Sequence, residues 1–393
     1  MKHLFLYETS FLWTNEKEGL IYNTKTKSHY HFSLSDSDIN KACTDWKILD
    51  KLYSTIYDET KVSSEFLTFS EAIISKGLGG IAEDGEKMVS FFPQLNIIDS
   101  VEKIHNRDDQ WNSVPVLNYL SRIVAFLGGT FDQFEKYKQI FSPLISNELL
   151  EPSRFFAFIK ECNSLSIAHI DLFVSCWNES LIAGFADGLS DIKEKTRFFF
   201  ADPYPGFNNL ILEKLEKSGF TIIHLCVPDS KFNKADWVKG REYRLLVRND
   251  NDVEYWESLL GEESGVNYEF KPIADNNLEF FRKNVFLSEE EILSQNLTKK
   301  DIFRHQALNV NQFGTFYIFP DGTIHPASDA PAIGTLEDSV HQTIIRELEE
   351  NHAWRQTRRL MEPCKNCIYH DLCPSPSVYE RILGVPGCTY WKE

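Results

Sequence analysis

The sequence predicts an α/β protein with a small module before its main region and a cysteine-rich tail after it. Three observations predict this division. Between Val89 and Leu297, apolar strand-like runs alternate with helix-like stretches, which is typical of parallel strands joined by crossover helices. The first 85 residues hold short strand-like runs followed by helical segments. Four of the eight cysteines lie within the last 30 residues.

Length and charge limit the classes of function. The 393 residues suffice for two or three domains at about 100–200 residues each. A formal net charge of −17 disfavours a general nucleic-acid binder or a protein that binds anionic membranes. No uncharged apolar run is long enough to span a bilayer, and Met1–Trp13 lacks the features of a signal peptide. We therefore expect a cytoplasmic protein without disulfides and without nucleic-acid or membrane partners.

The first predicted domain covers residues 1–85. Short runs rich in aromatic and β-branched residues predict strands at His3–Tyr7, Phe11–Thr14, Gly19–Asn23 and Ser28–Phe32. Apolar residues at helical spacing then predict helices at Ser35–Tyr57 and Ser64–Ser75. Strands followed by helices indicate a winged-helix-like module. The acidic residues of the first helix argue against docking on DNA.

The second predicted domain covers residues 86–300. The predicted strands are Arg122–Leu127, His169–Ser175, Arg197–Ala201, Thr221–Val227, Glu242–Val247 and Asn267–Lys271. The predicted helices are Thr130–Phe141, Ser153–Asn163, Phe207–Lys217 and Val253–Leu260. This alternation fits a doubly wound sheet or a full or partial barrel. The polar segment Arg282–Lys300 leads into the last domain.

The third predicted domain covers residues 301–393 and opens with a hairpin. The apolar run Thr315–Phe319, the turn Pro320-Asp321-Gly322 and the run Thr323–His325 predict two paired strands. A helix is predicted from Ser339 to Leu360.

The strongest local motif is Cys364-x2-Cys367-x5-Cys373-x14-Cys388. Four thiolates in this spacing can complete a tetrahedral set around zinc or hold a [4Fe–4S] cluster, and the spacing does not decide between them. Because all four ligands come from the protein, we expect the metal to have a structural role and to cross-link a turn-rich tail. The other cysteines, Cys43, Cys162, Cys176 and Cys226, are expected to be small buried apolar residues.

The last domain resembles the SPASM domain of peptide-modifying radical SAM enzymes. The residues that carry the resemblance are Phe313-Gly314, Tyr317–Pro326, Ile333–Asp338 and Cys364-x2-Cys367-x5-Cys373. The resemblance implies that Cys364, Cys367, Cys373 and Cys388 are the ligands of a second auxiliary [4Fe–4S] cluster. The positions that would bind the first cluster hold Ala327, Ser339 and Ser377. We therefore expect one iron–sulfur cluster, or one zinc ion, in this domain.

The upstream region departs from active radical SAM enzymes. These enzymes bind their catalytic cluster through Cys-x3-Cys-x2-Cys, and this chain has no such motif and no cysteine between Cys43 and Cys162. We therefore expect no bound S-adenosylmethionine. The whole pattern resembles the pseudo-radical SAM proteins of Bacteroidales-type double-glycine-leader peptide systems. The resembling segments are Phe5–Thr9, Phe11–Trp13, Gly19–Asn23, Arg304–Asn309 and Pro363–Glu380.

This resemblance implies a degenerate partial (β/α) barrel of radical SAM type and two partners. The partners would be a precursor peptide with a double-glycine leader and a true radical SAM/SPASM maturase. The first domain resembles the leader-recognition element of such systems, in which the leader adds a strand to a sheet edge. Tyr30, Phe32, Leu34 and Trp46 are the candidate peptide contacts, and the alternative is that all four belong to the core.

The expected function is that of a catalytically degenerate protein that binds a precursor peptide and assists its active relative. One alternative is an enzyme that uses the barrel cavity without S-adenosylmethionine chemistry. Another is a purely structural, metal-stapled scaffold. No His-Glu-x2-His, Gly-x4-Gly-Lys-Ser/Thr or Gly-x-Ser-x-Gly motif occurs, so no residue is assigned a catalytic role.

Overall fold

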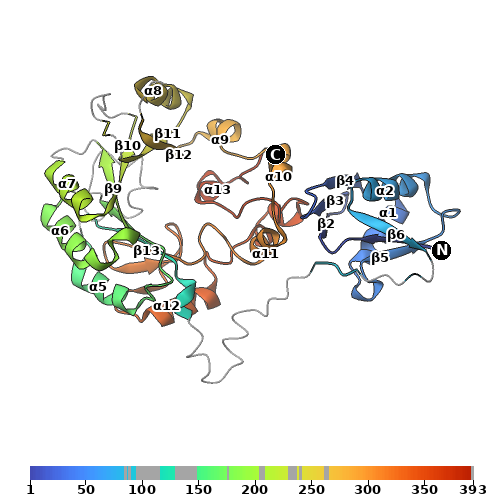
Figure 1. Ribbon diagram of the computed structural model, residues 1–393, viewed down its shortest axis with the longest axis horizontal. Helices are drawn as coiled ribbons and strands as arrows, with labels where there is room; N and C mark the ends of the chain where they lie inside the picture. The colour runs from blue at the N-terminus through green and yellow to red at the C-terminus, as the bar shows by residue number, and fades with distance from the viewer. Residues whose placement is uncertain are drawn as a thin grey trace.

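The computed structural model describes residues 1–83, 86, 90–93, 116–128, 148–174, 177–202, 209–228, 237–238, 241–260 and 265–390. It shows a mixed α/β protein with a large, mostly parallel sheet, which confirms the predicted class (Figure 1). The predicted helix Thr130–Phe141 lies outside the described residues.

The N-terminal part contains two three-stranded antiparallel sheets, with orders β5–β1–β6 and β2–β3–β4. Their strands are β1 (Lys2–Leu6), β2 (Ser10–Thr14), β3 (Glu18–Asn23), β4 (His29–Ser33), β5 (Ser54–Tyr57) and β6 (Gly79–Glu83). The helices are α1 (Ser37–Trp46) and α2 (Ser64–Ser75). The predicted bounds of α2 are confirmed, and the Ser63 side chain caps it by accepting a hydrogen bond from the Phe66 N–H.

The prediction of one helix from Ser35 to Tyr57 was wrong. Helix α1 ends at Trp46, a short 3-10 turn covers Leu49–Lys51, and the chain then enters β5. Leu52 and Tyr53 have φ values of 50° and 58°, which end helical geometry although the apolar spacing continues through them. The segment after them pairs with β1, and its β-branched residues suit a strand.

Both faces of the sheet β2–β3–β4 are buried. One face packs on α1 and α2 around Phe32, Trp46 and Phe69. The other face, which includes Phe11 and Trp13, packs against residues of the C-terminal tail. This explains the unbroken burial of β3 from Gly19 to Asn23. The N-terminal sheet and the cysteine-rich tail therefore share one core.

The large sheet has nine strands in the order β12–β11–β10–β9–β8–β7–β13–β14–β15. Its parallel strands are β7 (Arg122–Phe126), β8 (His169–Val174), β9 (Thr196–Asp202), β10 (Thr221–Cys226), β11 (Glu242–Val247), β12 (Asn267–Pro272) and β13 (Thr315–Ile318). The antiparallel strands at the other end are β14 (Thr323–His325) and β15 (Gly334–Thr335). All six strands predicted for the middle domain are present, as is the predicted hairpin.

The order of β7 to β12 is monotonic, whereas a doubly wound sheet reverses direction in its middle. Because crossovers of this kind are right-handed, such an order places the connecting helices on one side of the sheet. Helices α5 (Pro152–Glu161), α6 (Glu179–Gly188), α7 (Asn209–Ser218) and α8 (Asp250–Leu260) form an arc on that outer side (Figure 1). Strand β13 pairs with β7, so the sheet continues past residue 300.

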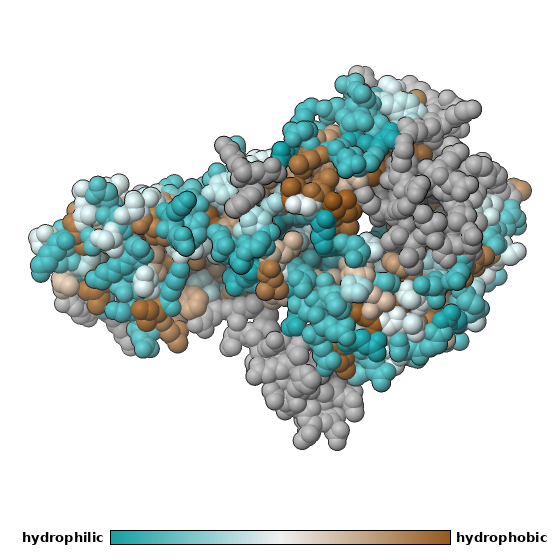
Figure 2. Space-filling view, turned by 180° about the vertical axis from the view of Figure 1, so that it is seen from behind, coloured by the Kyte–Doolittle hydropathy of each residue, from teal (hydrophilic) through white to brown (hydrophobic). Residues whose placement is uncertain are grey.

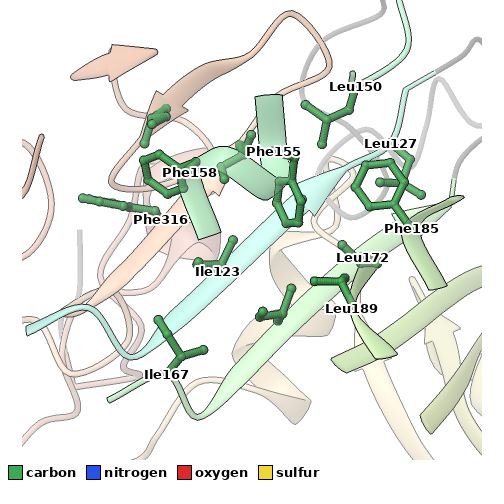
Figure 3. Packing of buried hydrophobic residues seen from close by; sticks show 14 of the residues in the cluster. Ile123, Leu127, Leu150, Phe155, Phe158, Ile167, Leu172, Phe185, Leu189 and Phe316 are labelled. Atoms are coloured by element: carbon green, nitrogen blue, oxygen red, sulfur yellow. The ribbon is translucent and has the colours of Figure 1, made fainter. Parts of the chain in front are cut away.

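The largest hydrophobic core lies between the sheet and these helices. Figure 3 shows Ile123 and Leu172 from β7 and β8 packed near Phe155, Phe158 and Phe185. These five side chains are at most 1% exposed. Because side chains alternate along a strand, the neighbouring residues of each strand face the opposite, inner side of the sheet.

The C-terminal region begins with three short helices, α9 (Leu278–Asn284), α10 (Glu289–Ser294) and α11 (Lys299–Ala307), and continues after the hairpin with α12 (Val340–Glu350) and α13 (Val378–Leu383). The prediction that one helix continues to Leu360 was wrong. Asn351 adopts a left-handed conformation with φ of 54° and ends α12. The buried Glu347 carboxylate then accepts hydrogen bonds from the backbone N–H groups of Ala353 and Trp354, which fixes the turn after the helix.

Within the described ranges, no helix has the length and apolar character needed to cross a membrane. Figure 2 shows one face of the molecule, on which hydrophilic residues predominate and hydrophobic residues form limited patches.

Candidate functional site

Strand β4 is an edge of the sheet β2–β3–β4. It pairs with β3 on one side, and the described residues supply no partner strand on the other. A free edge presents backbone N–H and C=O groups to which an extended segment can add as a further strand. The edge lies next to α2, whose Phe69 contacts the aromatic rings of β4.

The four candidate peptide contacts divide into two pairs. Trp46 is fully buried and its indole Nε1 donates a hydrogen bond to the backbone oxygen of Leu4. Phe32 is 7% exposed and its ring lies 4.8 Å from that of Phe69. Both side chains therefore lie in the hydrophobic core. Tyr30 and Leu34 pack against the same cluster but remain partly exposed, so a peptide at this edge can reach them.

A surface pocket of about 350 Å³ lies beside β4 and is lined by Lys17, Glu18, His31, Phe32 and Ser33. The polar side of this pocket is hydrogen-bonded to the C-terminal tail. His31 Nε2 lies 2.7 Å from a Glu18 carboxylate oxygen, and the Tyr390 hydroxyl donates to the other oxygen at 2.8 Å. Partial burial opposes the Glu18 charge, but hydrogen bonds from Tyr390, His31 and Asn15 outweigh it and lower the pKa of Glu18.

A second polar contact joins the N-terminal sheet to the tail through Asp371, which is 1% exposed. The indole Nε1 of Trp13 donates to Asp371 Oδ2 at 2.7 Å, and the Gln306 amide donates to the same oxygen at 2.9 Å. The Arg359 guanidinium binds both carboxylate oxygens. Trp13 and Asp371 are 358 residues apart, and no spacing in the sequence indicates that they meet.

The four clustered cysteines come after α12 in the sequence. Three of them precede α13, and Cys388 follows it. All four are free thiols, with Cys364 and Cys373 buried and Cys367 and Cys388 half-buried. Arg358 Nη1 lies 3.5 Å from the sulfur of Cys364, and the Tyr369 N–H donates to the sulfur of Cys367 at 3.5 Å. Such N–H donors stabilise a thiolate.

Burial is the largest influence on the pKa of three of these thiols. It raises the pKa of Cys367 to about 11 and also raises the pKa of Cys364 and Cys373, and each of these three thiols is influenced by the charge of Cys388. The sulfur of Cys388 therefore lies within electrostatic range of the other three, and thiolates in general suit zinc or an iron–sulfur cluster. Across the part of the chain that the structure describes, however, no three His, Cys, Asp or Glu side chains converge as metal ligands. Electrostatic influence reaches much farther than a metal–sulfur bond of about 2.3 Å, so these two findings are compatible. The metal site stays a prediction.

A buried ion pair organises the backbone around the cysteines. Arg358 and Glu380 are 6% and 5% exposed, and the guanidinium contacts both carboxylate oxygens at 2.8 and 3.2 Å. Glu380 also accepts hydrogen bonds from the backbone N–H groups of Ser377 and Gly387. Removing either partner would leave an unpaired buried charge, so this pair fixes the segment between Cys373 and Cys388.

The inner face of the large sheet carries a row of phenylalanines. Phe126, Phe173 and Phe199 are neighbours in register on β7, β8 and β9, and Phe319 contacts Phe126. The rings of Phe173 and Phe199 are stacked with centroids 4.5 Å apart. This row therefore forms an apolar strip on the face of the sheet opposite the outer helices.

No protein-family model and no curated protein matches the chain. Comparison with solved structures finds three matching chains. One is the crystal structure of Streptococcus suis SuiB bound to precursor peptide SuiA, with a TM-score of 0.42 and 9% sequence identity over 98% of each chain. Another is selenomethionine BtrN in an open conformation, with a TM-score of 0.33 and 10% identity over 63% of this chain and 92% of that chain.

Proposed function

We propose that the chain is a catalytically degenerate radical SAM/SPASM-like protein that binds a ribosomal precursor peptide and assists a true radical SAM peptide maturase. The observation that carries the peptide-binding part is the edge of β4, for which the described residues supply no second partner strand. There the partly exposed Tyr30 contacts Phe69 of α2, and Leu34 packs against the same core just after the strand. An extended double-glycine leader would add there as an antiparallel or parallel strand, with apolar side chains against these two residues.

The helper role rests on the sequence. A catalytic cluster requires three thiolates in the Cys-x3-Cys-x2-Cys arrangement, and the chain has none of this spacing. A protein that keeps a peptide-binding edge but lacks this motif can present the peptide to a partner enzyme. The negative net charge of −17 favours a leader or a partner with basic residues.

We further propose that Cys364, Cys367, Cys373 and Cys388 hold one metal centre, a [4Fe–4S] cluster or a zinc ion. The support is the Cys-x2-Cys-x5-Cys-x14-Cys spacing and the N–H donors on two of the sulfurs. When bound, the centre would cross-link a tail that is otherwise held by side-chain contacts.

Peptide binding can be tested by fluorescence anisotropy with a labelled peptide that carries a double-glycine leader. Tyr30→Asp and Leu34→Asp place a charge at the β4 edge, and we expect each to weaken binding about tenfold. Leu165→Asp is the matched control, because Leu165 is 90% exposed in the turn between α5 and β8. Equal binding by the edge variants and the control would refute the site.

The helper role needs a separate measurement. The maturase encoded with the peptide should be retained by the immobilised full-length chain, and retention should increase when the leader is present. If neither the leader nor the maturase associates, the assisting role fails even if the chain is well folded.

A further inference from the structure

Two arginines share one buried carboxylate on the inner face of the large sheet. Asp171 on β8 is fully buried. The Arg122 Nε and Nη2 atoms lie 2.8 and 2.6 Å from Asp171 Oδ2. The Arg197 Nε donates to Oδ1 at 2.6 Å and its Nη2 to Oδ2 at 2.9 Å. The three residues come from adjacent strands, β7, β8 and β9, so the sheet itself fixes their positions.

This group has one positive charge in excess. Asp171 carries one negative charge and the two guanidinium groups carry two positive charges, since arginine stays protonated. His169 lies beside Arg122 in register, and burial together with the charge of Arg197 lowers the pKa of His169, so it adds no charge at neutral pH. This local positive charge contrasts with the formal net charge of −17 of the whole chain.

Both arginines also keep hydrogen-bonding capacity. Each uses Nε and Nη2 on Asp171, and the described residues supply no partner for either Nη1 atom. The side chains remain accessible, because Arg122 is 39% and Arg197 is 24% exposed. The guanidinium of Arg197 lies over the ring of Phe199, 5.7 Å from its centroid, and so borders the phenylalanine row.

We propose that Arg122 and Arg197 form a binding site for a carboxylate whose neighbouring group is apolar. The ligand carboxylate would accept hydrogen bonds from the two Nη1 groups and balance the excess charge, while the partly exposed Phe173 offers the apolar contact. A single negative charge balances the site, whereas a phosphate dianion would leave a negative excess beside Asp171, so the charge favours a carboxylate. The site lies on the large sheet and its test does not depend on the β4 edge.

A peptide can supply such a carboxylate from a glutamate side chain or from its C-terminus. Three probes separate these sources on the full-length chain: acetyl-Glu-Phe-amide, acetyl-Gln-Phe with a free carboxylate, and acetyl-Gln-Phe-amide. Ligand-observed NMR titration measures the dissociation constant of each. We expect at least one acidic probe to bind about tenfold tighter than the neutral amide, as charge-assisted hydrogen bonds provide. The tighter of the two acidic probes identifies the source.

Two substitutions are expected to change the affinity for the acidic probe in opposite directions. Arg197→Gln should weaken the acidic probe about tenfold. Asp171→Asn should strengthen it, because it removes the competing negative charge while keeping one acceptor oxygen. Arg244→Gln is the control, because Arg244 lies on the same sheet but pairs with Glu242 and Glu269. Equal binding of all three probes to the unmodified chain would overturn the site, and this comparison stands even where a variant does not fold. Weaker binding by folded Asp171→Asn would overturn it as well.

Discussion

The contact between Trp13 and Asp371 predicts how strongly the N-terminal sheet is attached to the cysteine-rich tail. In Trp13→Phe, the ring still fills most of its position, but the hydrogen bond to the buried carboxylate is lost. A hydrogen bond to a charged group contributes about 1.5–3 kcal/mol, and the smaller ring removes about 1 kcal/mol of packing. We therefore expect a loss of about 2.5–4 kcal/mol in the free energy of unfolding.

Trp46→Phe provides the matched control. Trp46 is equally deep in a core, but its indole Nε1 donates to a neutral backbone oxygen, that of Leu4, at 3.2 Å. Such a bond contributes about 0.5–1.5 kcal/mol, so this variant should lose less stability than Trp13→Phe. Because both variants lose the same part of the ring, the difference between them reports how much more the charged hydrogen bond contributes than the neutral one.

Urea unfolding followed by circular dichroism gives the two stabilities, and hydrogen exchange locates the effect. In Trp13→Phe, faster exchange should appear both in β2 and β3 and in the tail around Asp371, since the contact joins them. If Trp46→Phe is the more costly change, or if faster exchange in Trp13→Phe stays within the N-terminal sheet, the assignment of this contact as the link is wrong.

Two further predictions concern the tail and α12. Alanine at any one of Cys364, Cys367, Cys373 or Cys388 should lower bound iron or zinc, measured by elemental analysis after anaerobic purification, whereas Cys162→Ala should keep it; full metal content in all four variants would exclude the site. Burial raises the pKa of Glu347 above its usual value despite three backbone hydrogen bonds. Because its folded-state pKa is raised, its contribution to stability is most favourable at low pH and is lost as pH rises through the folded pKa. Glu347→Gln should reduce that loss in unfolding experiments between pH 4 and 8, and an unchanged pH profile would contradict the assignment.

The strands of the large sheet were predictable because their burial is nearly continuous. In β10, for example, every residue from Ile222 to Cys226 is buried, and such a run between polar segments identifies a strand in a parallel sheet without any knowledge of its neighbours. The bounds of α2 were equally predictable, because its apolar residues repeat at helical spacing. Both signals are local.

The errors arose where a distant contact overrides a local pattern. The apolar spacing after Trp46 is helical, but Tyr53 takes a left-handed conformation while its hydroxyl donates to Ser10 and its backbone oxygen accepts from Leu6. Neither partner is near it in sequence. The helix predicted to reach Leu360 failed for a related reason, since Glu347 bonds the backbone beyond the helix rather than within it.

The candidate site shows the same division. The clustering of four cysteines is visible in the sequence, and the identity of β4 as a strand was predicted correctly. That β4 is an edge, that Trp46 is buried beneath it, and that Asp171 joins two arginines all depend on which strands are neighbours. Strand order is a long-range property, and the spacing of residues along the chain does not encode it directly.

The placement of the sheet β2–β3–β4 gives the two proposed sites a physical connection. One face of this sheet rests on α1 and α2, and the other rests on the tail that carries the cysteines. The pocket beside β4 is closed on its polar side by Glu18, which Tyr390 of the tail holds in place. A peptide strand added to β4 would therefore lie beside Glu18, and the position of Glu18 depends on how well the tail is ordered. If the proposed metal centre orders the tail and thereby strengthens peptide binding at β4, the peptide must raise the affinity for the metal by the same factor, because coupling between two binding sites is reciprocal.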